Sequence, residues 1–256
     1  KKIEKLESLG LLAGGIAHDF NNFLTAIIGN ISLARTMVEP GSDLYEILTS
    51  SEHAASKASS LPRQLLTFSR GGNPVKESVS ISRLLRESAS FVLSGSISTA
   101  EYSIADDLNR VTVDKAQIQQ VFGNIIMNAH QAMPEGGTVH ISAENIVIDE
   151  NYPEAIPEGH YVLIVIKDEG YGIDDNHLSK VFDPFFTTKQ NGTGLGLATA
   201  YSIISKHNGH ILVDTEVCKG SMFKIYLPLN SSDENHSINE LGPARLTGGR
   251  ILVMDD

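Results

Sequence analysis

Apolar residues recur at steps of three and four from Leu6 to Phe68, and this spacing constrains the fold more than any other feature of the chain. Such a period is typical of helices that pack along a coiled-coil seam. Turn residues at 39–43 divide the series, and residues 71–74 end it. The pattern predicts one helix over residues 1–38 and a second that begins near Leu44. The seam positions are Leu6, Leu9, Leu12, Ile16, Phe20, Phe23, Ile27, Ile31 and Ala34, then Leu44, Ile47, Ser51, Ala54, Ala58, Leu61, Leu65 and Phe68.

Two helices joined by a short turn form a hairpin, and one hairpin alone cannot bury two apolar seams. Two chains together bury them as a four-helix bundle. Residues 1–73 are therefore predicted to be a dimerisation domain, and the chain a homodimer. Pro62 lies inside the second helix, where we expect it to kink the backbone.

From Glu77 the sequence mixes helical and strand patterns, which we assign to a second domain over residues 77–229. Strands and helices do not alternate regularly, so the pattern favours an α+β sandwich over a doubly wound sheet. Residues 230–247 are polar and are expected to be a linker. Helices are predicted at 82–93, 114–133 and 194–207, and strands at 138–147, 161–167, 209–216 and 221–227.

Composition narrows the range of partners. The net charge of -11 repels nucleic-acid phosphates and anionic lipid headgroups, so we expect no nucleic-acid or membrane-surface binding. No apolar run reaches the about 18 residues of a membrane span. The single Cys218 fits a reducing compartment. We therefore expect a cytoplasmic protein, and a fragment of a longer one that carries any membrane anchor elsewhere, because the sequence starts at Lys1 without a methionine.

His18 is the first candidate for chemistry. It lies two residues from the seam positions Ile16 and Phe20, about 200° of helical rotation away, so its imidazole is expected to face outward. Asp19 can orient or deprotonate the ring, and Asn22, one turn along the same face, can position a water or a phosphoryl oxygen. A solvated surface histidine is the simpler interpretation, but these neighbours favour a nucleophile for covalent phosphoryl transfer.

Two clusters in the second domain suit a nucleotide and its metal. Asn124 and Asn128 share one helix face and offer amide oxygens to Mg²⁺ and phosphates, unless they are ordinary surface amides. Asp168 follows a buried-type strand and precedes Gly170 and Gly172, which allow a ligand to approach the backbone. Its carboxylate is expected to accept a hydrogen bond from an exocyclic amine, although the same pattern also forms ordinary turns.

A third cluster, residues 192–196, opens a helix whose free N–H groups are suited to phosphate. No Gly-Lys-Ser/Thr follows and no βαβ unit surrounds it, so neither a P-loop nor a dinucleotide fold fits. The irregular residues 168–193 are long enough to suggest a mobile lid over a ligand. Within it, Lys189 is expected to meet a terminal phosphate, or else to be a solvated loop lysine.

Together these motifs resemble the transmitter core of sensor histidine kinases, in the same order and over residues 1–229. The resemblance implies a hairpin followed by an ATP-binding domain of the histidine kinase, gyrase and heat-shock ATPase type. It also implies Mg-ATP-dependent autophosphorylation on His18, relay to a receiver-domain aspartate, and phosphatase activity on that partner. The five matches are His18-Asp19, Asn124 to Asn128, Asp168 to Gly172, residues 182–186 and residues 192–196.

The resemblance also implies roles for single residues. Asp19 is expected to act as general base for His18, and Asn22 to support dephosphorylation of the partner. Asp168 is expected to bind the adenine amino group, and Asn128 and Asn124 to coordinate Mg²⁺. The other expected ATP-site residues are Gln131, Gly170, Gly172, Ile173, Phe182, Thr188, Lys189, Gly192, Thr193, Gly194, Leu195 and Gly196.

Two positions depart from the family pattern. Asp19 stands where many relatives carry glutamate, and Gln131 where many carry lysine or arginine, so Lys189 is expected to supply the missing charge. Residues 248–256 end in Asp255-Asp256 and resemble the first strand and acidic pair of a receiver domain. This implies a hybrid kinase, with an incidental tail as the alternative.

Two other functions stay open on the sequence alone. Gyrase-type, mismatch-repair and heat-shock ATPases use related asparagine and glycine motifs, although they lack the histidine hairpin. A non-catalytic dimerisation scaffold that keeps ATP as a structural ligand is the second. The sequence does not reveal the input signal, the partner's identity, or whether phosphorylation occurs within or between chains.

Overall fold

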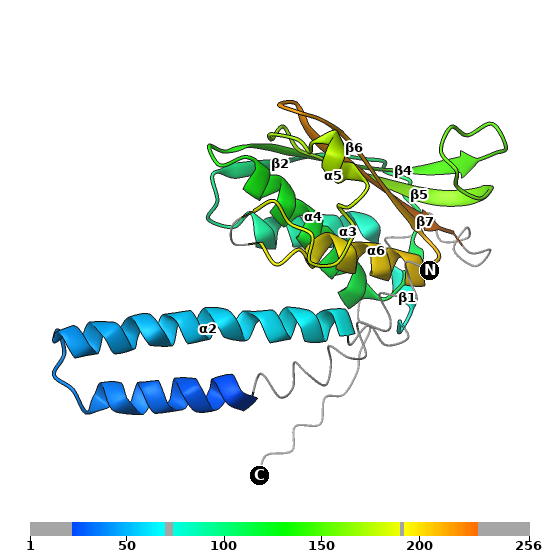
Figure 1. Ribbon diagram of the computed structural model, residues 1–256. Coiled ribbons are helices and arrows are strands. Elements are labelled where there is room, and N and C mark those ends of the chain that lie inside the picture. The colour runs from blue at the N-terminus through cyan, green and yellow to red at the C-terminus, as the bar shows by residue number, and fades with distance from the viewer. Residues whose placement is uncertain (1–21, 70–73, 190–191, 230–256) are drawn as a thin grey trace, which may run out of the picture.

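The computed structural model describes residues 22–69, 74–189 and 192–229, with the side chains of residues 57–69 left undescribed. It contains a helical hairpin and an α/β domain (Figure 1). The predicted phosphoacceptor pair His18-Asp19, the predicted linker 230–247 and the receiver-like residues 248–256 lie outside the described residues. The predicted fold class, a helical hairpin followed by an α+β sandwich, is confirmed.

The hairpin pairs a helix described over residues 22–36 with α2 (Asp43–Ser69), which runs back beside it (Figure 1). Ser42 caps α2, because its Oγ accepts a hydrogen bond from the N–H of Tyr45 at 3.2 Å. Arg35 joins the two helices through an ion pair with Glu52 and a contact 6.0 Å from the centre of the Tyr45 ring. α2 continues through Pro62 as an unbroken helix.

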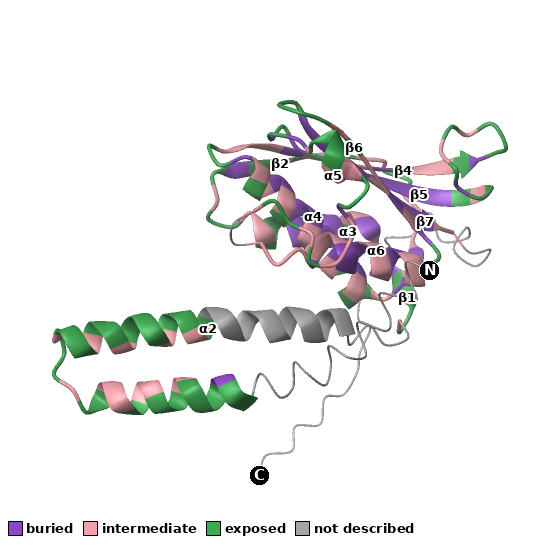
Figure 2. Ribbon diagram, viewed as in Figure 1, coloured by how far each residue is buried: buried purple, intermediate pink, exposed green. Residues whose placement is uncertain are grey.

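Much of the described apolar seam of the hairpin is exposed in the single chain. Leu24, 7% exposed, is the one buried side chain among residues 22–56. In contrast, Phe23 is 67% exposed, Ile27 47% and Ile47 61%. Figure 2 shows much of the described hairpin in the colour of exposed residues. Among the described residues, a single chain therefore leaves uncovered a large part of the seam that its sequence predicts to be buried.

The α/β domain is a five-stranded sheet with helices on one face (Figure 1). The strand order is β2-β4-β5-β7-β6, in which β2 pairs parallel with β4 and every other pair is antiparallel. A separate two-stranded sheet joins β1 (Glu77–Val79) to β3 (Val111–Val113). The main strands are β2 (Ser98–Ile104), β4 (Gly137–Ile148), β5 (Gly159–Lys167), β6 (His210–Glu216) and β7 (Gly220–Pro228), and the helices are α3 (Ile81–Val92), α4 (Lys115–Ala132), α5 (Asp175–Leu178) and α6 (Gly196–Lys206).

Helix α4 is central to the core, where it contacts α3, α6 and the sheet. Its apolar face is fully buried against inward-facing strand residues such as Ile164 of β5. Burial of several large side chains at about 25 cal/mol per Å² is the main force that holds the layers together. The buried residues of α4 are Ile118, Val121, Phe122, Ile125, Ile126 and Ala129.

Each predicted helix and strand of this domain lies close to an observed one. The sequence did not predict β1, β2 or β3. In β2, polar residues alternate with Ala100, Tyr102 and Ile104, which are its apolar residues that pack against the core. Its place at the sheet edge explains the weak apolar signal, because only one face is covered.

The buried His207 connects the C-terminal end of α6 to the N-terminal end of α4. His207, 3% exposed, accepts a hydrogen bond at Nε2 from the Asp114 N–H (2.9 Å) and donates from Nδ1 to the Ile203 carbonyl (2.8 Å). Asp114 caps α4 by accepting from the Gln117 N–H at 3.0 Å. Its other carboxylate oxygen accepts from the Val75 N–H, also at 3.0 Å. The segment that follows the hairpin is thereby attached to the start of α4.

Replacing His207 with leucine is expected to destabilise the α/β domain, because it leaves the Asp114 N–H unpaired. The expected loss at pH 8 is about 1–3 kcal/mol in the free energy of unfolding. Burial, with a smaller contribution from the charge of Lys76, lowers the pKa of His207 in the folded protein. The unfolded state therefore takes up the proton first, so the stabilisation is complete above about pH 6.5 and declines as the pH falls below it.

Denaturant unfolding of the wild type and His207→Leu between pH 5 and 8 measures this effect. The difference in stability should narrow below about pH 6.5. The exposed His53→Leu on the hairpin is the control and should show no such narrowing. A difference that is the same at every pH contradicts the assignment of a neutral, accepting imidazole.

Candidate functional site

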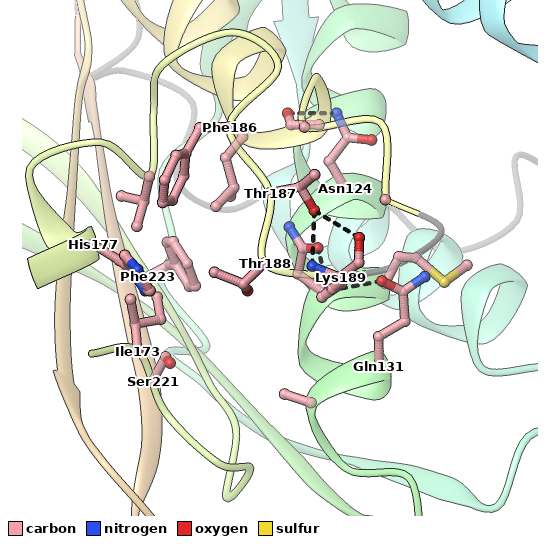
Figure 3. A pocket seen from close by; sticks show the side chains of 18 of the residues that line it. Asn124, Gln131, Ile173, His177, Phe186, Thr187, Thr188, Lys189, Ser221 and Phe223 are labelled. Atoms are coloured by element: carbon pink, nitrogen blue, oxygen red, sulfur yellow. Dashed lines mark hydrogen bonds between the residues drawn. The ribbon is translucent and has the colours of Figure 1, made fainter.

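A cavity of about 660 Å³ is lined by α4, the α5–α6 segment and the ends of β5 and β7 (Figure 3). Every ATP-site residue predicted in this domain lines it except Gly170 and Phe182. Motifs that lie far apart in the sequence therefore meet around one space. The predicted residues that line it are Asn124, Asn128, Gln131, Asp168, Gly172, Ile173, Thr188, Lys189, Gly192, Thr193, Gly194, Leu195 and Gly196.

Asp168 forms the floor of the cavity at the end of β5 and is 3% exposed. Its Oδ1 accepts hydrogen bonds from the N–H groups of Gly170 (2.9 Å) and Ser221 (3.2 Å). Burial raises the pKa of this carboxyl, while those two bonds and the charge of Lys189 act in the opposite direction. The side chain is held in one orientation, so its second oxygen can receive a donor from a ligand.

β7 reaches Asp168 only because Gly220 has no side chain. A Cβ at Gly220 would lie 1.9 Å from the Asp168 carbonyl oxygen, and the backbone has a φ of 101°. The close approach also allows the Asp168 N–H to donate to the Ser221 carbonyl at 2.9 Å. Gly220, which belongs to none of the predicted motifs, thus allows β7 to pack against the predicted Asp168.

Gly170 and Phe182 lie behind the cavity wall. A Cβ at Gly170 would stand 2.6 Å from the carbonyl oxygen of Ala132, so this glycine lets the end of α4 pack on the segment after β5. The Phe182 ring packs 5.5 Å from that of Tyr201 and against the main core. It attaches the α5–α6 segment to helix α6.

Amide groups of α4 form the opposite side of the cavity. Asn124 Nδ2 donates to the Gly196 carbonyl at 3.0 Å, which fixes the side chain against the start of α6. Asn128 Oδ1 and Gln131 Oε1 both accept from the Lys189 ammonium, at 2.9 and 2.7 Å. Uncharged amide oxygens of this kind are suitable ligands for a hard cation such as Mg²⁺.

Helix α6 begins at the cavity with donors that no side chain caps. Its N-cap residue is Leu195, which makes no side-chain capping hydrogen bond. The first N–H groups of a helix have no partner within the helix and favour an anion. A phosphate chain at this end, a metal at the amide oxygens and a base near Asp168 fit the groups present.

The wall near Asp168 contains the predicted Ile173 together with residues that the sequence did not single out. Ile173 and Phe223 are apolar, and Ser221 lies beside them (Figure 3). The His177 ring packs 5.5 Å from that of Phe186 at the same wall. Ser221 and Phe223 reach the site through the pairing of β7 with β5, a register that no local motif signals. Met127 and Tyr171 also line the cavity and were not predicted.

Of the predicted catalytic residues in the hairpin, the structure describes Asn22, which is exposed at the start of the described helix. His18 and Asp19 precede the described residues, so their distance from the cavity is not defined. Within residues 22–69, 74–189 and 192–229, no helix is long and apolar enough to cross a membrane.

Known proteins are similar to this chain in sequence and in fold. Residues 113–231 match the family described as histidine kinase-, DNA gyrase B-, and HSP90-like ATPase. The chain is 40% identical over 233 residues to the sensor kinase CckA of Brucella abortus (strain 2308), covering 88% of this chain and 25% of that protein. It is 36% identical over 233 residues to sporulation kinase A of Bacillus subtilis (strain 168), covering 89% and 36%. The chain therefore spans only about a quarter to a third of the length of these relatives.

Solved structures agree with the fold. Full-length ShkA in complex with AMPPNP superposes with a TM-score of 0.67 over 85% of this chain and 45% of that one, at 21% identity. The mycobacterial sensor histidine kinase MprB gives 0.51 over 60% of this chain and 97% of that one, at 27% identity. The superposition on ShkA includes part of the hairpin, because it covers more of this chain than the α/β domain alone contains.

Gly220→Ala is expected to lower the free energy of unfolding of the α/β domain by more than the conformational cost of placing alanine at a positive φ. Gly95 has a φ of 72° with nothing within 4 Å of an added Cβ, so Gly95→Ala reports the conformational cost alone, about 1–2 kcal/mol. At Gly220 the added methyl group must also displace β7 from Asp168. Equal shifts of the two variants in denaturant unfolding contradict the close contact described here.

Proposed function

The chain belongs to the sensor histidine kinase family, and from this premise we propose that it uses Mg-ATP to phosphorylate its own His18 and then transfers the phosphoryl group to a receiver-domain aspartate. One observation carries the proposal: a buried carboxylate, amide oxygens and an uncapped helix start surround one cavity. A nucleoside triphosphate presents a base, a metal and phosphates to such groups. Phosphoryl transfer depends mainly on their positioning and on charge neutralisation.

In this proposal the adenine ring lies against Ile173 and Phe223 and donates its amino group to Asp168. The apolar walls favour a flat ring, and the fixed carboxylate selects a base that carries an exocyclic donor. An oxygen at that position of the ring would face Asp168 as a second acceptor, so the site is expected to prefer adenine to guanine.

The metal and the triphosphate occupy the other end of the cavity. Asn128 is the proposed Mg²⁺ ligand, joined by Asn124, whose Nδ2 is already bonded to Gly196 and whose Oδ1 remains for the metal or a phosphate. When bound, Mg²⁺ neutralises charge on the phosphates. The start of α6 receives the phosphate oxygens with its N–H groups, and Gln131, Thr188, Lys189 and Thr193 complete the lining.

The neutral His18 imidazole attacks the γ-phosphorus, the bond between that phosphorus and the β–γ bridging oxygen breaks, and ADP leaves. Asp19 accepts the proton that the ring releases. The phosphoryl group then passes to an aspartate carboxylate of a receiver domain, either on a separate protein or on the segment that residues 248–256 begin. Asn22, exposed four residues after His18, is proposed to orient the water that dephosphorylates the partner.

The hairpin supports a homodimer, which we propose forms through residues 1–73. Phe23, Ile27, Leu44 and Ile47 are large apolar residues that remain exposed on a single hairpin. A second hairpin covers them in a four-helix bundle. The proposed division continues with a catalytic domain at 77–229, a linker at 230–247 and a receiver start at 248–256, in a cytoplasmic setting consistent with the single Cys218.

Autophosphorylation is tested by incubating the protein with Mg²⁺ and γ-labelled ATP. The wild type and the control His53→Ala, which lacks an exposed histidine of α2, should acquire acid-labile, alkali-stable label. His18→Ala should acquire none. Label that persists on His18→Ala refutes His18 as acceptor. ATP binding without label on any variant favours the non-catalytic scaffold.

Asp168→Asn tests the proposed adenine contact. Asparagine can keep the bonds from Gly170 and Ser221, but its amide donor then faces the adenine amino group. ADP affinity, measured by calorimetry, should fall about 10- to 100-fold, as expected for loss of a hydrogen bond to a charged acceptor. The neighbouring Glu169→Gln changes an exposed carboxylate that pairs with His140 and should bind ADP as the wild type does. Unchanged affinity of Asp168→Asn contradicts the base position.

A further inference from the structure

The Lys189 ammonium lies among the oxygens that the proposed function assigns to metal and phosphate. It donates to Asn128 Oδ1 at 2.9 Å and to Gln131 Oε1 at 2.7 Å. These two side chains are three residues apart on α4, so they share one face of the helix and point at the same place. Figure 3 shows the lysine side chain extending from its own segment toward Gln131.

The backbone around Lys189 holds the side chain in that direction. The Lys189 N–H donates to Thr187 Oγ1 at 3.1 Å, and the Gly192 N–H donates to the Lys189 carbonyl at 3.1 Å. A Cβ at Gly192 would stand 2.3 Å from Thr187 Oγ1, so a side chain there would displace the hydroxyl that accepts from the Lys189 N–H. The half-buried Lys189 side chain is therefore held toward α4 and does not extend into solvent.

The partners of the ammonium are electrically neutral. Among the described residues its hydrogen bonds go to two amide oxygens, and the carboxylate of Asp168 acts on it only through space. Gln131 matters for this arrangement, because a cationic side chain at that position would repel the ammonium. Two hard oxygens around one positive charge resemble part of a coordination shell for a metal cation.

We propose that Lys189 is a tethered cation that occupies the metal-ligand oxygens of α4 and must leave them before a metal–nucleotide complex can bind. The inference rests on the proposed function, because it takes Asn128 as a metal ligand. Two cations cannot share that oxygen at hydrogen-bond and coordination distances without strong repulsion. Lys189 is thus a positioning residue that sets how much metal the site requires.

Displacement has a second consequence. Residues 182–189 are attached at one end by Phe182, which packs on Tyr201, and at the other by the Lys189 contact with α4. Metal binding releases the second attachment and frees the ammonium to meet the phosphates. A lysine that serves only as a phosphate ligand makes no contribution before nucleotide arrives, and this difference separates the two roles.

The first test measures ADP binding as Mg²⁺ is varied, since ADP lacks the terminal phosphate that a simple phosphate-binding lysine would contact. In Lys189→Met, the Mg²⁺ concentration for half-maximal ADP binding should fall about tenfold, the scale of one lost charge-assisted contact. Lys180→Met removes an exposed lysine of the same connection and should match the wild type. An unchanged or increased Mg²⁺ requirement in Lys189→Met overturns the proposal.

The second test needs neither metal nor nucleotide. Amide hydrogen exchange over residues 183–189 in the free protein should be faster in Lys189→Met than in the wild type or Lys180→Met, because the attachment to α4 is lost. Gln131→Leu, which removes one of the two acceptors, should give a smaller increase. Equal exchange in all four proteins overturns the attachment. Failure of the wild type to bind ADP at all refutes the proposed function instead, and exchange then still reports on the contact itself.

Discussion

The buried carboxylate of Asp168 is the constraint on which the rest of the α/β domain depends. A carboxylate at 3% exposure is tolerated only where donors compensate for its lost hydration. Two backbone N–H groups do so, one from Gly170 in the following turn and one from Ser221 on β7. Each of these hydrogen bonds depends on a close backbone contact that only glycine allows. Gly170 lies against the end of α4, and Gly220 lies against the backbone of Asp168. The turn, the neighbouring strand and the end of α4 are therefore positioned by the same group that is proposed to recognise the base.

Helix α4 connects this site to the rest of the chain. Its C-terminal half carries Asn124, Asn128 and Gln131, and its first turn is capped by Asp114. Asp114 also bonds to Val75, just after the hairpin, and to the buried His207 at the end of α6. The segment after the hairpin is thus hydrogen-bonded directly to the cap of the helix that presents the amide oxygens.

Much of the α/β domain could be predicted because its strong signals are local. The Asp114 cap, the apolar face of α4 and the strand over residues 161–167 each depend on neighbouring residues, and the structure agrees with them. The missed parts depend on distant pairing. β2 is an edge strand with small residues, and Ser221 and Phe223 reach the cavity only through the register of β7 on β5. α2 continues as a helix through Pro62, and the kink expected there stays a prediction.

The exposed seam of the hairpin gives the two domains different thermodynamics. The α/β domain closes its own core, so its free energy of unfolding does not depend on the amount of protein. A hairpin that buries Phe23, Ile27, Leu44 and Ile47 only against a second copy is stabilised by mass action. Each tenfold dilution then lowers the stability of such a bundle by about 1.4 kcal/mol and leaves the stability of the α/β domain unchanged. In the proposed dimer, a low concentration of the protein would therefore unfold the hairpin while the α/β domain stays folded.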